Sequence, residues 1–292
     1  MDNKFNNMLN EFLANANAKN EEELNEKLQE FMKKYNNGEI EYTNTPLDDA
    51  YELLGKAQNA KTKKESIKLA KQAYDMCRDC FDALLFQVEL EDNSIKRDKL
   101  LNEGLDYEKE RLEKEGYFKK DTIGHFYDIF ETRPYIGGLY RKANYLIIDG
   151  KAKQARDVCL EILRLNNNDN TGARYLLMAI YAYLEEEKEM LKLSKKYQED
   201  TLQMLFPQFI LYYKLGKEKE AKELLDIINK ENPHFIKFFK RTIKPNMDIP
   251  YGSYSIGDSS EVLMYFEEYF FLIVTLPSIR DFILENSKKT KK

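Results

Sequence analysis

The chain of 292 residues carries 46 Lys and Arg against 51 Asp and Glu, so its formal net charge is −5. Nonspecific nucleic-acid binding needs a strongly positive surface, and this charge balance argues against it. The hydrophobic fraction of 42%, with only 12 Gly and 7 Pro, suffices for a packed core and argues against general disorder.

No stretch has the pattern of a signal peptide or of a membrane-spanning helix. Residues 1–10 are polar and lack the apolar core of a signal peptide. The longest apolar run, residues 269–276, is far shorter than the ~20 residues that a spanning helix needs. Three cysteines in a chain of this size favour a reducing compartment. We therefore expect a cytoplasmic protein without a membrane partner.

Residues 1–38 are predicted to form an N-terminal helical arm. Asn20, followed by three glutamates, has the pattern of a capped helix start, and Gly38 ends the arm. Its apolar residues form two stripes: Phe5, Met8, Leu9, Phe12 and Leu13, then Leu24, Leu28, Phe31, Met32 and Tyr35. The pattern fits either a capping hairpin or a separately mobile handle.

Between residues 47 and 240 the apolar pattern predicts recurring pairs of helices. In the central pair, Pro134 suits a first helical turn, Gly150 suits a helix end, and residues 166–170 form a turn cluster. Small and large residues alternate along this pair at Ile136, Leu139, Ala143, Leu146, Gly150, Ala155 and Ile162. Small residues let two helices approach closely, and the larger ones fill the space between them.

The same pattern returns along the chain. Gly216 follows Gly150 by about 66 residues, close to two periods of ~34 residues. A good copy covers residues 202–233, a degenerate copy covers 170–200, and a further unit begins near Leu47. The period and the residue pattern resemble the tetratricopeptide family, which implies an all-α, tetratricopeptide-like helical-repeat solenoid.

Two segments carry a narrower resemblance. Gly124-His125-Phe126 leads into residues 131–135, ETRPY, and residues 165–170, LNNNDN, follow the central helix pair. Together they resemble bacterial tetratricopeptide proteins related to the suppressor of tumorigenicity seven family. That resemblance implies a repeat fold and a scaffolding role rather than a defined reaction.

Residues 241–286 are predicted to be C-terminal capping helices, followed by a disordered tail at 287–292. A loop rich in Pro, Gly, Ser and Tyr precedes Asp258, which has the pattern of an N-cap. One long helix is expected over 261–276, apolar on nearly every side and buried at the end of the solenoid. The same helix could instead pair two copies of the chain, so the oligomeric state stays open.

His125, Asp128 and Glu131 are spaced three residues apart and would share one face of a helix. A His with two carboxylates could bind a divalent metal or perform acid–base chemistry. The simpler explanation is a helix-cap segment with a hydrogen-bonded His and a Glu131–Arg133 pair, and the only other histidine is His234. A metal-binding protein or metal-dependent enzyme is therefore the alternative function.

The cysteines and glycines point to no other chemistry. Cys77 and Cys80 form a lone C-x-x-C without a second ligand pair, and Cys159 lies within a predicted helix, so core positions are expected. The glycine motifs of the common nucleotide loops are absent from the sequence. We predict a protein that is not an enzyme and holds no cofactor or metal.

In tetratricopeptide arrays the first helix of each pair lines a concave face. This resemblance implies a peptide-binding set: Tyr140, Arg141, Asn144, Arg174, Met178 and Tyr181. Asn144 and Arg174 resemble the residues with which some such repeats bind a peptide's terminal carboxylate. The predicted function is a non-enzymatic adaptor for a protein or peptide partner. The alternative is that Ile147, Phe206 and Ile210 pack against the C-terminal helix and leave no open groove.

Overall fold

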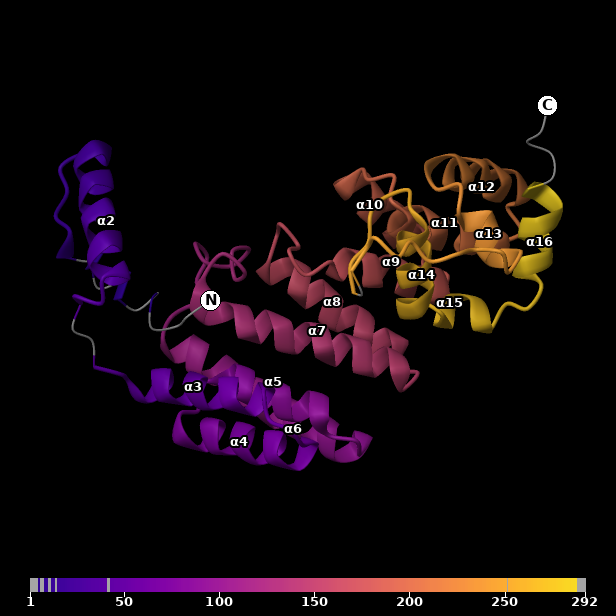
Figure 1. Ribbon diagram of the computed structural model, residues 1–292. Coiled ribbons are helices and arrows are strands. Elements are labelled where there is room, and N and C mark those ends of the chain that lie inside the picture. Colours follow the sequence, from indigo (N-terminus) through magenta and orange to yellow (C-terminus); the bar gives the residue numbers. More distant parts are fainter. Residues whose placement is uncertain are drawn as a thin grey trace. The chain divides into compact units, whose positions relative to one another are not determined.

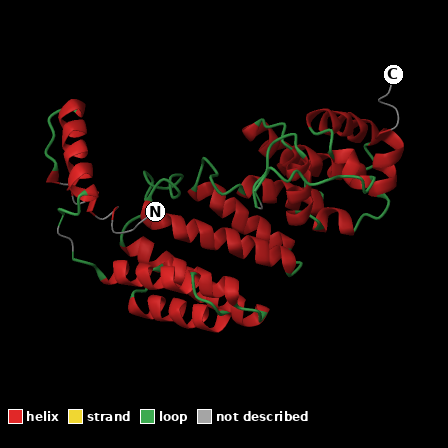
Figure 2. Ribbon diagram, viewed as in Figure 1, coloured by secondary structure: helices red, strands yellow, loops and turns green. Residues whose placement is uncertain are grey.

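The computed structural model describes residues 5, 8, 9, 12, 13, 15–40, 43–250 and 252–287. These residues form helices joined by loops, with no β-strand among them (Figure 2). The prediction of an all-α fold is confirmed. The chain divides into two compact units, Met1–Glu115 and Gly116–Lys292, and the predicted tail beyond residue 287 lies outside the described residues.

The first unit contains the predicted arm and the first helix pairs. Helix α2 (Glu21–Asn36) begins where the Asn20 side chain accepts a hydrogen bond from the backbone N–H of Glu23, and three glutamates occupy its first turn. Phe31 of α2 is buried and stacks on Phe12, with ring centroids 4.8 Å apart. Apolar burial of Phe31 against the preceding segment thus fixes one side of α2, whereas Met32 of the predicted stripe is 39% exposed.

The remaining helices of the first unit pack in chain order. They are α3 (Pro46–Gln58), α4 (Lys63–Met76), α5 (Phe81–Leu90) and α6 (Ser94–Lys114). Helix α3 begins with a reciprocal pair of hydrogen bonds between Thr45 and Asp48, and α4 and α6 begin with side-chain caps from Thr62 and Asn93. Each helix contacts the next one along the chain.

The second unit continues with consecutive helices. A loop that ends in the short 3-10 helix η1 (Phe130–Thr132) leads into α7 (Arg133–Ile148), α8 (Ala152–Leu165), α9 (Ala173–Leu184), α10 (Glu187–Tyr197), α11 (Leu202–Lys214) and α12 (Glu218–Glu231). Gly150 and Gly216 adopt left-handed backbone conformations, with φ of 72° and 68°, between the helices of two pairs. Contacts join α7 to α8, α8 to α9, α9 to α10 and α11 to α12, and α9 also contacts α11 (Figure 1).

The C-terminal segment differs from its prediction in one respect. Instead of one helix over 261–276, the chain forms α14 (Ser259–Glu268) and the short α15 (Phe271–Val274). Helix α13 (Phe235–Phe239) precedes them, and α16 (Ile279–Asn286) follows them. The break at Tyr269 keeps both Tyr269 and Leu272 buried while the intervening Phe270 is 52% exposed. Asp258 caps α14 by accepting a hydrogen bond from the backbone N–H of Ser260, as the sequence predicts.

The core of the second unit is densest where the C-terminal helices meet α11. The fully buried ring of Phe206 lies 5.4 Å from Phe235, 5.6 Å from Tyr265 and 5.2 Å from Phe266, measured between ring centroids. Such edge-on aromatic pairs add stability beyond their buried area. No helix among the described residues has the length and apolarity needed to cross a membrane.

Candidate binding surface

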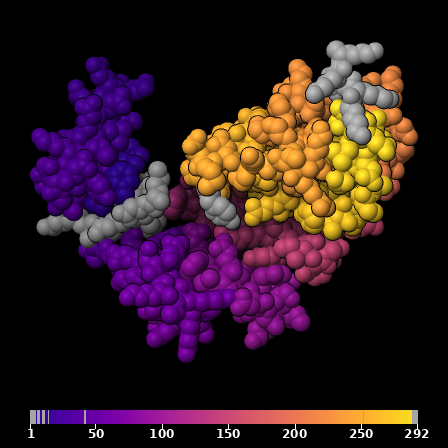
Figure 3. All heavy atoms as spheres, turned by 45° about the vertical axis from the view of Figure 1, so that its right-hand side comes forward, coloured from indigo at the N-terminus to yellow at the C-terminus, as the bar shows by residue number. Residues whose placement is uncertain are grey.

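The C-terminal segment covers the face that α9 and α11 present. Helix α14 contacts α11, and α15 contacts α9. At the second contact the ring centroids of Tyr183 and Phe271 are 6.0 Å apart. Figure 3 shows the C-terminal residues, in orange and yellow, as one contiguous surface of the second unit. The face predicted to form a groove therefore packs a stretch of polypeptide from the same chain.

Two of the six predicted peptide-binding residues are buried in the packing around α9. Met178 is 0% exposed and Tyr181 is 4% exposed, both on α9. Burial raises the pKa of Tyr181 to about 12, so its hydroxyl stays protonated at neutral pH. These two side chains serve the core, and a partner could reach them only if the structure around α9 opened.

Three of the six residues lie together on α7 and remain half-exposed: Tyr140, Arg141 and Asn144, here called the α7 patch. The Asn144 side-chain amide donates to the backbone oxygen of Tyr140 at 2.9 Å, and Arg141 Nη1 donates to the Gly137 oxygen at 3.2 Å. Burial, together with the charge of Glu268, raises the pKa of Tyr140 to about 12. The patch presents an aromatic ring, a cation and an amide on neighbouring turns.

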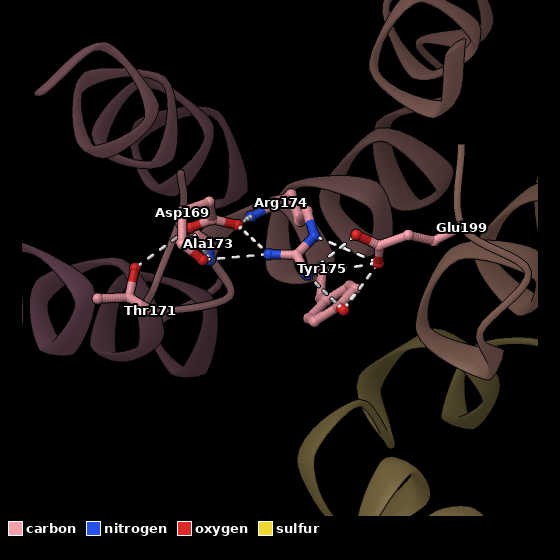
Figure 4. Close-up of polar contacts among 6 residues, drawn as sticks. All are labelled: Asp169, Thr171, Ala173, Arg174, Tyr175 and Glu199. Atoms are coloured by element: carbon pink, nitrogen blue, oxygen red, sulfur yellow. Dashed lines mark hydrogen bonds and ion pairs between the residues drawn. The ribbon is translucent and has the colours of Figure 1, made fainter. Parts of the chain in front are cut away.

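The sixth residue, Arg174, is held by carboxylates of the chain itself (Figure 4). Its Nη1 donates to the Asp169 backbone oxygen at 3.1 Å and to Asp169 Oδ2 at 2.9 Å, and its Nη2 lies 3.2 Å from Glu199 Oε1. Burial works against its charge, but the hydrogen bond to Asp169 keeps the pKa of Arg174 above its ordinary value. The hydroxyl of Tyr175 completes the cluster by donating to Glu199 at 2.8 Å.

Asp169 explains why Arg174 is placed there. Its side chain is 0% exposed and accepts backbone N–H groups from Ala173 and Arg174, each at 2.8 Å, at the start of α9. The carboxylate thus caps the helix while the guanidinium neutralises it. A peptide carboxylate would have to displace Glu199 to reach Arg174. In this structure Arg174 therefore stabilises the start of α9 rather than presenting a free cation.

The two segments that carried the family resemblance contact each other. Gly124 and Phe126 both donate backbone N–H groups to the Leu165 oxygen at 3.0 Å, and Asn167 donates to the Gly124 oxygen at 2.8 Å. The Thr132 hydroxyl donates to the backbone oxygen of Phe126. These contacts hold the loop before α7 against the C-terminal end of α8. Both segments therefore have a structural role that their local sequence pattern did not reveal.

His125 and Asp128 come together, but not on a helix. His125 Nδ1 lies 3.2 Å from Asp128 Oδ2, and both side chains are exposed. The expectation of a shared helical face was wrong, because the residues form turns and Glu131 belongs to the separate η1. Among the described residues, no three His, Cys, Asp or Glu side chains are grouped to hold a metal. Metal binding at this place stays a prediction.

The cysteines occupy core or helix-end positions. Cys80 is buried at the start of α5, and burial raises its thiol pKa to about 12. Cys159 is fully buried in α8, and burial raises its pKa well above the ordinary value. Both thiols are therefore protonated at neutral pH, and neither is a good nucleophile.

One concave feature has no counterpart among the predicted residues. A pocket of about 460 Å³, here called the C-terminal pocket, lies between α13, the loop after it, α15 and the start of α16. Its lining is mainly apolar and includes Phe238, Ile243, Phe270, Ile273 and Leu276, with Arg241 and Arg280 also lining it. These residues come from two stretches that are distant in sequence, residues 238–243 and 270–280, so no local periodicity could have found the pocket.

The geometry defines an all-helical protein in which consecutive helices pack on one another and the C-terminal segment covers one face of the second unit. No protein-family model matches the chain, and the search of curated proteins finds no match to it. The resemblances drawn from the sequence therefore rest on the quoted segments alone.

Proposed function

We propose that the chain is a non-enzymatic, cytoplasmic adaptor that binds a protein or peptide partner, with its second unit built as a tetratricopeptide-like solenoid. The observation that carries the proposal is the packing of α14 and α15 on the face of α9 and α11. The α9 and α11 face binds a separate stretch of the same chain through apolar and aromatic side chains. Peptide-binding grooves bind their peptides through side chains of the same kind. The left-handed glycines at 150 and 216 support the repeat assignment.

The α7 patch is the less buried part of the predicted binding set. Tyrosine contributes a large amphipathic ring, and arginine contributes charge-assisted hydrogen bonds, which are the two features most enriched at interface hot spots. Both side chains are half-exposed, whereas Met178 and Tyr181 are buried. We therefore assign partner contact to Tyr140, Arg141 and Asn144, and a structural role to Arg174.

The pattern of pKa shifts supports a non-enzymatic role. Catalytic groups usually have pKa values moved toward neutrality. Here burial raises the pKa of the Tyr181 hydroxyl and of the Cys80 thiol to about 12, further from neutrality. Burial raises the pKa of Glu108 toward neutrality, but this carboxyl is held in a buried ion pair with Arg111. His125 is exposed and pairs with a single carboxylate.

Affinity capture from the source lysate tests the proposal. Wild-type protein is compared with Arg141→Glu and with the control Arg164→Glu, which reverses an exposed charge on α8 that pairs with Glu161 at 2.7 Å. We expect a partner that wild type and control retain and that Arg141→Glu loses. Circular dichroism checks that all three are folded. Equal capture by all three, or capture by none, would remove the support for binding through the α7 patch.

A further inference from the structure

The C-terminal pocket combines an apolar lining with an exposed apolar rim. Phe239 and Ile279 are buried at 5% and 2% exposure, whereas Phe270 at the rim is 52% exposed, and nearby Val274 is 59% exposed. A volume of about 460 Å³ is within the range of sites that accept a ligand or a few side chains. Exposed aromatic and aliphatic groups around a hollow mark an interaction surface.

The segment that contributes Phe238, Arg241 and Ile243 to the pocket is strongly basic, although the whole chain is acidic. Residues 235–244, FIKFFKRTIK, contain four cationic side chains and no acidic one, against a net charge of −5 for the chain. These cations are Lys237, Lys240, Arg241 and Lys244, all exposed. Within the described residues, no Asp or Glu side chain forms an ion pair with any of the four. Unpaired cations of this kind favour an anionic partner.

Arg280 provides a fixed cation on the other side. Its Nε donates to the Phe239 backbone oxygen at 3.1 Å, which ties α16 to the end of α13. Its Nη1 lies 3.7 Å from Asp281, too far for a strong hydrogen bond. The anchored Arg280 guanidinium therefore holds its N–H donors beside the pocket, which Arg241 also lines.

We propose that the C-terminal pocket binds an acidic peptide segment of a protein partner, inserting one or two large apolar side chains and placing the flanking carboxylates on Arg241 and Arg280. The proposal rests on the adaptor function but uses a surface distinct from the α7 patch. A hollow lined by side chains from two separate stretches of chain fits an inserted side chain better than a flat lipid surface. The combination of apolar and cationic lining residues makes the pocket specific for an acidic peptide with a large apolar side chain. An apolar surface alone, or a cationic surface alone, would accept many partners.

A peptide phage library selected against the full-length protein tests this proposal. Enriched peptides carry Phe, Leu or another large apolar residue next to Asp or Glu. The selected peptide, labelled with fluorescein, binds the Phe270→Asp variant at least about tenfold more weakly, because the apolar anchor is lost. Arg241→Glu weakens binding about tenfold, and binding by wild type falls as salt is raised. Both substitutions are at exposed positions, so the fold is retained.

Matched controls lie on α12 of the same unit. Ile227→Asp replaces an apolar side chain that is 41% exposed, and Lys219→Glu reverses a lysine whose side chain is 86% exposed. Both are expected to bind the peptide as wild type does. Selection of no acidic–apolar peptide, or equal weakening by the controls, would overturn the proposal.

Two further outcomes separate this proposal from others. If the selected peptides are lost only by Arg141→Glu, the adaptor function stands and the pocket assignment fails. Vesicles that contain phosphatidylserine serve as a lipid probe. Suppose that wild type binds these vesicles, that Phe270→Asp abolishes the binding, and that no peptide binds. The pocket would then be assigned to a membrane surface, and the peptide proposal would be overturned.

Discussion

Arg174 and Asp169 form a pair in which the carboxylate is wholly buried and the guanidinium side chain is 15% exposed. Replacing Arg174 by Ala leaves Asp169 with its backbone donors but without its counter-charge. Breaking such a pair from one side costs about 3 kcal/mol of unfolding free energy. We expect a loss of this order for Arg174→Ala in urea denaturation.

Arg164→Ala is the control for that experiment. Arg164 pairs with Glu161 at 2.7 Å on an exposed face of α8, where an ion pair contributes less than about 1 kcal/mol. If the two variants lose equal stability, Arg174 is not the structural residue described above. It would then be available to a ligand, as the sequence suggested.

A second buried ion pair lies in the first unit. Glu108 of α6 has a side chain that is 0% exposed, and Arg111 donates to it through Nη2 at 2.7 Å and Nε at 3.0 Å. Burial raises the pKa of Glu108 above its ordinary value of 4.5, although the hydrogen bonds from Arg111 oppose that shift. Arg111 therefore lowers the free-energy cost of ionising the buried Glu108 carboxyl.

Replacing Arg111 by Met should produce a pH-dependent loss of stability. Without the arginine the pKa of Glu108 in the folded state rises further, so the folded state binds a proton more readily than the unfolded state does. Stability then falls as pH rises through and above the ordinary carboxyl range. We expect denaturant unfolding to show a larger loss at about pH 7.5 than at about pH 5.

The double variant Glu108→Gln/Arg111→Met provides the comparison, since it has no buried carboxylate at this place. Its difference from wild type should change much less between the two pH values than the difference of the single variant does. A loss for Arg111→Met that is equal at both values would show that packing, and not the charge of Glu108, sets its cost.

At the scale of elements, the loop before α7 depends on Gly124. Gly124 has φ of 101°, and a Cβ there would lie 2.3 Å from Asn167 Nδ2. Gly124→Ala therefore strains the backbone and forces the Asn167 side chain to move, at a cost of about 1–3 kcal/mol. Thermal unfolding measures the loss, and amide hydrogen exchange shows whether Phe126 loses its protection.

Gly137→Ala tests the reverse case on the adjoining helix. Gly137 lies inside α7 with an ordinary helical backbone, and an added Cβ would meet only the end of the Arg141 side chain, at 3.2 Å. Replacement of a helical glycine by alanine stabilises by about 0.5–1 kcal/mol where space allows. If Gly124→Ala were as well tolerated as Gly137→Ala, the docking of the loop would contribute little.

For the whole molecule, local patterns predicted the helices but not the way in which distant segments meet. Pro134 and Gly150 bound α7 as expected, because their effects are confined to one turn of backbone. The break at Tyr269 was missed, since residues apolar on nearly every side fit one helix or two equally well. The contact of Gly124 with Leu165 was also missed, because it joins loop residues that have no periodicity.

The candidate sites show the same limit. The position of Tyr140 on a half-exposed helical face could be predicted from repeat position alone. The burial of Met178 and Tyr181 could not, because it depends on which helices pack around α9 after folding. The C-terminal pocket depends on two distant stretches, residues 238–243 and 270–280, and its residues resemble ordinary core positions when each stretch is considered separately.

The second unit should fold by itself, and its C-terminal segment should be necessary for that. Phe206 is fully buried against Tyr265 and Phe266. Asn232, at the end of α12, donates to the buried Glu261 of α14 at 2.8 Å. A fragment of residues 116–292 keeps all these contacts, so we expect helical circular dichroism and a single cooperative thermal transition.

A fragment of residues 116–240 loses α14 to α16 and is the matched comparison. Without Tyr265 and Phe266 the ring of Phe206 is exposed, and Asn232 loses its hydrogen-bond partner Glu261. A large apolar face is then exposed to water. We expect a broad, non-cooperative transition and binding of a hydrophobic dye. If the shorter fragment instead melts as sharply and at the same temperature as the longer one, α14 is a removable cover over an intact repeat face. The part of the α9 and α11 face that the C-terminal segment contacts would then be open to a partner whenever that cover is displaced.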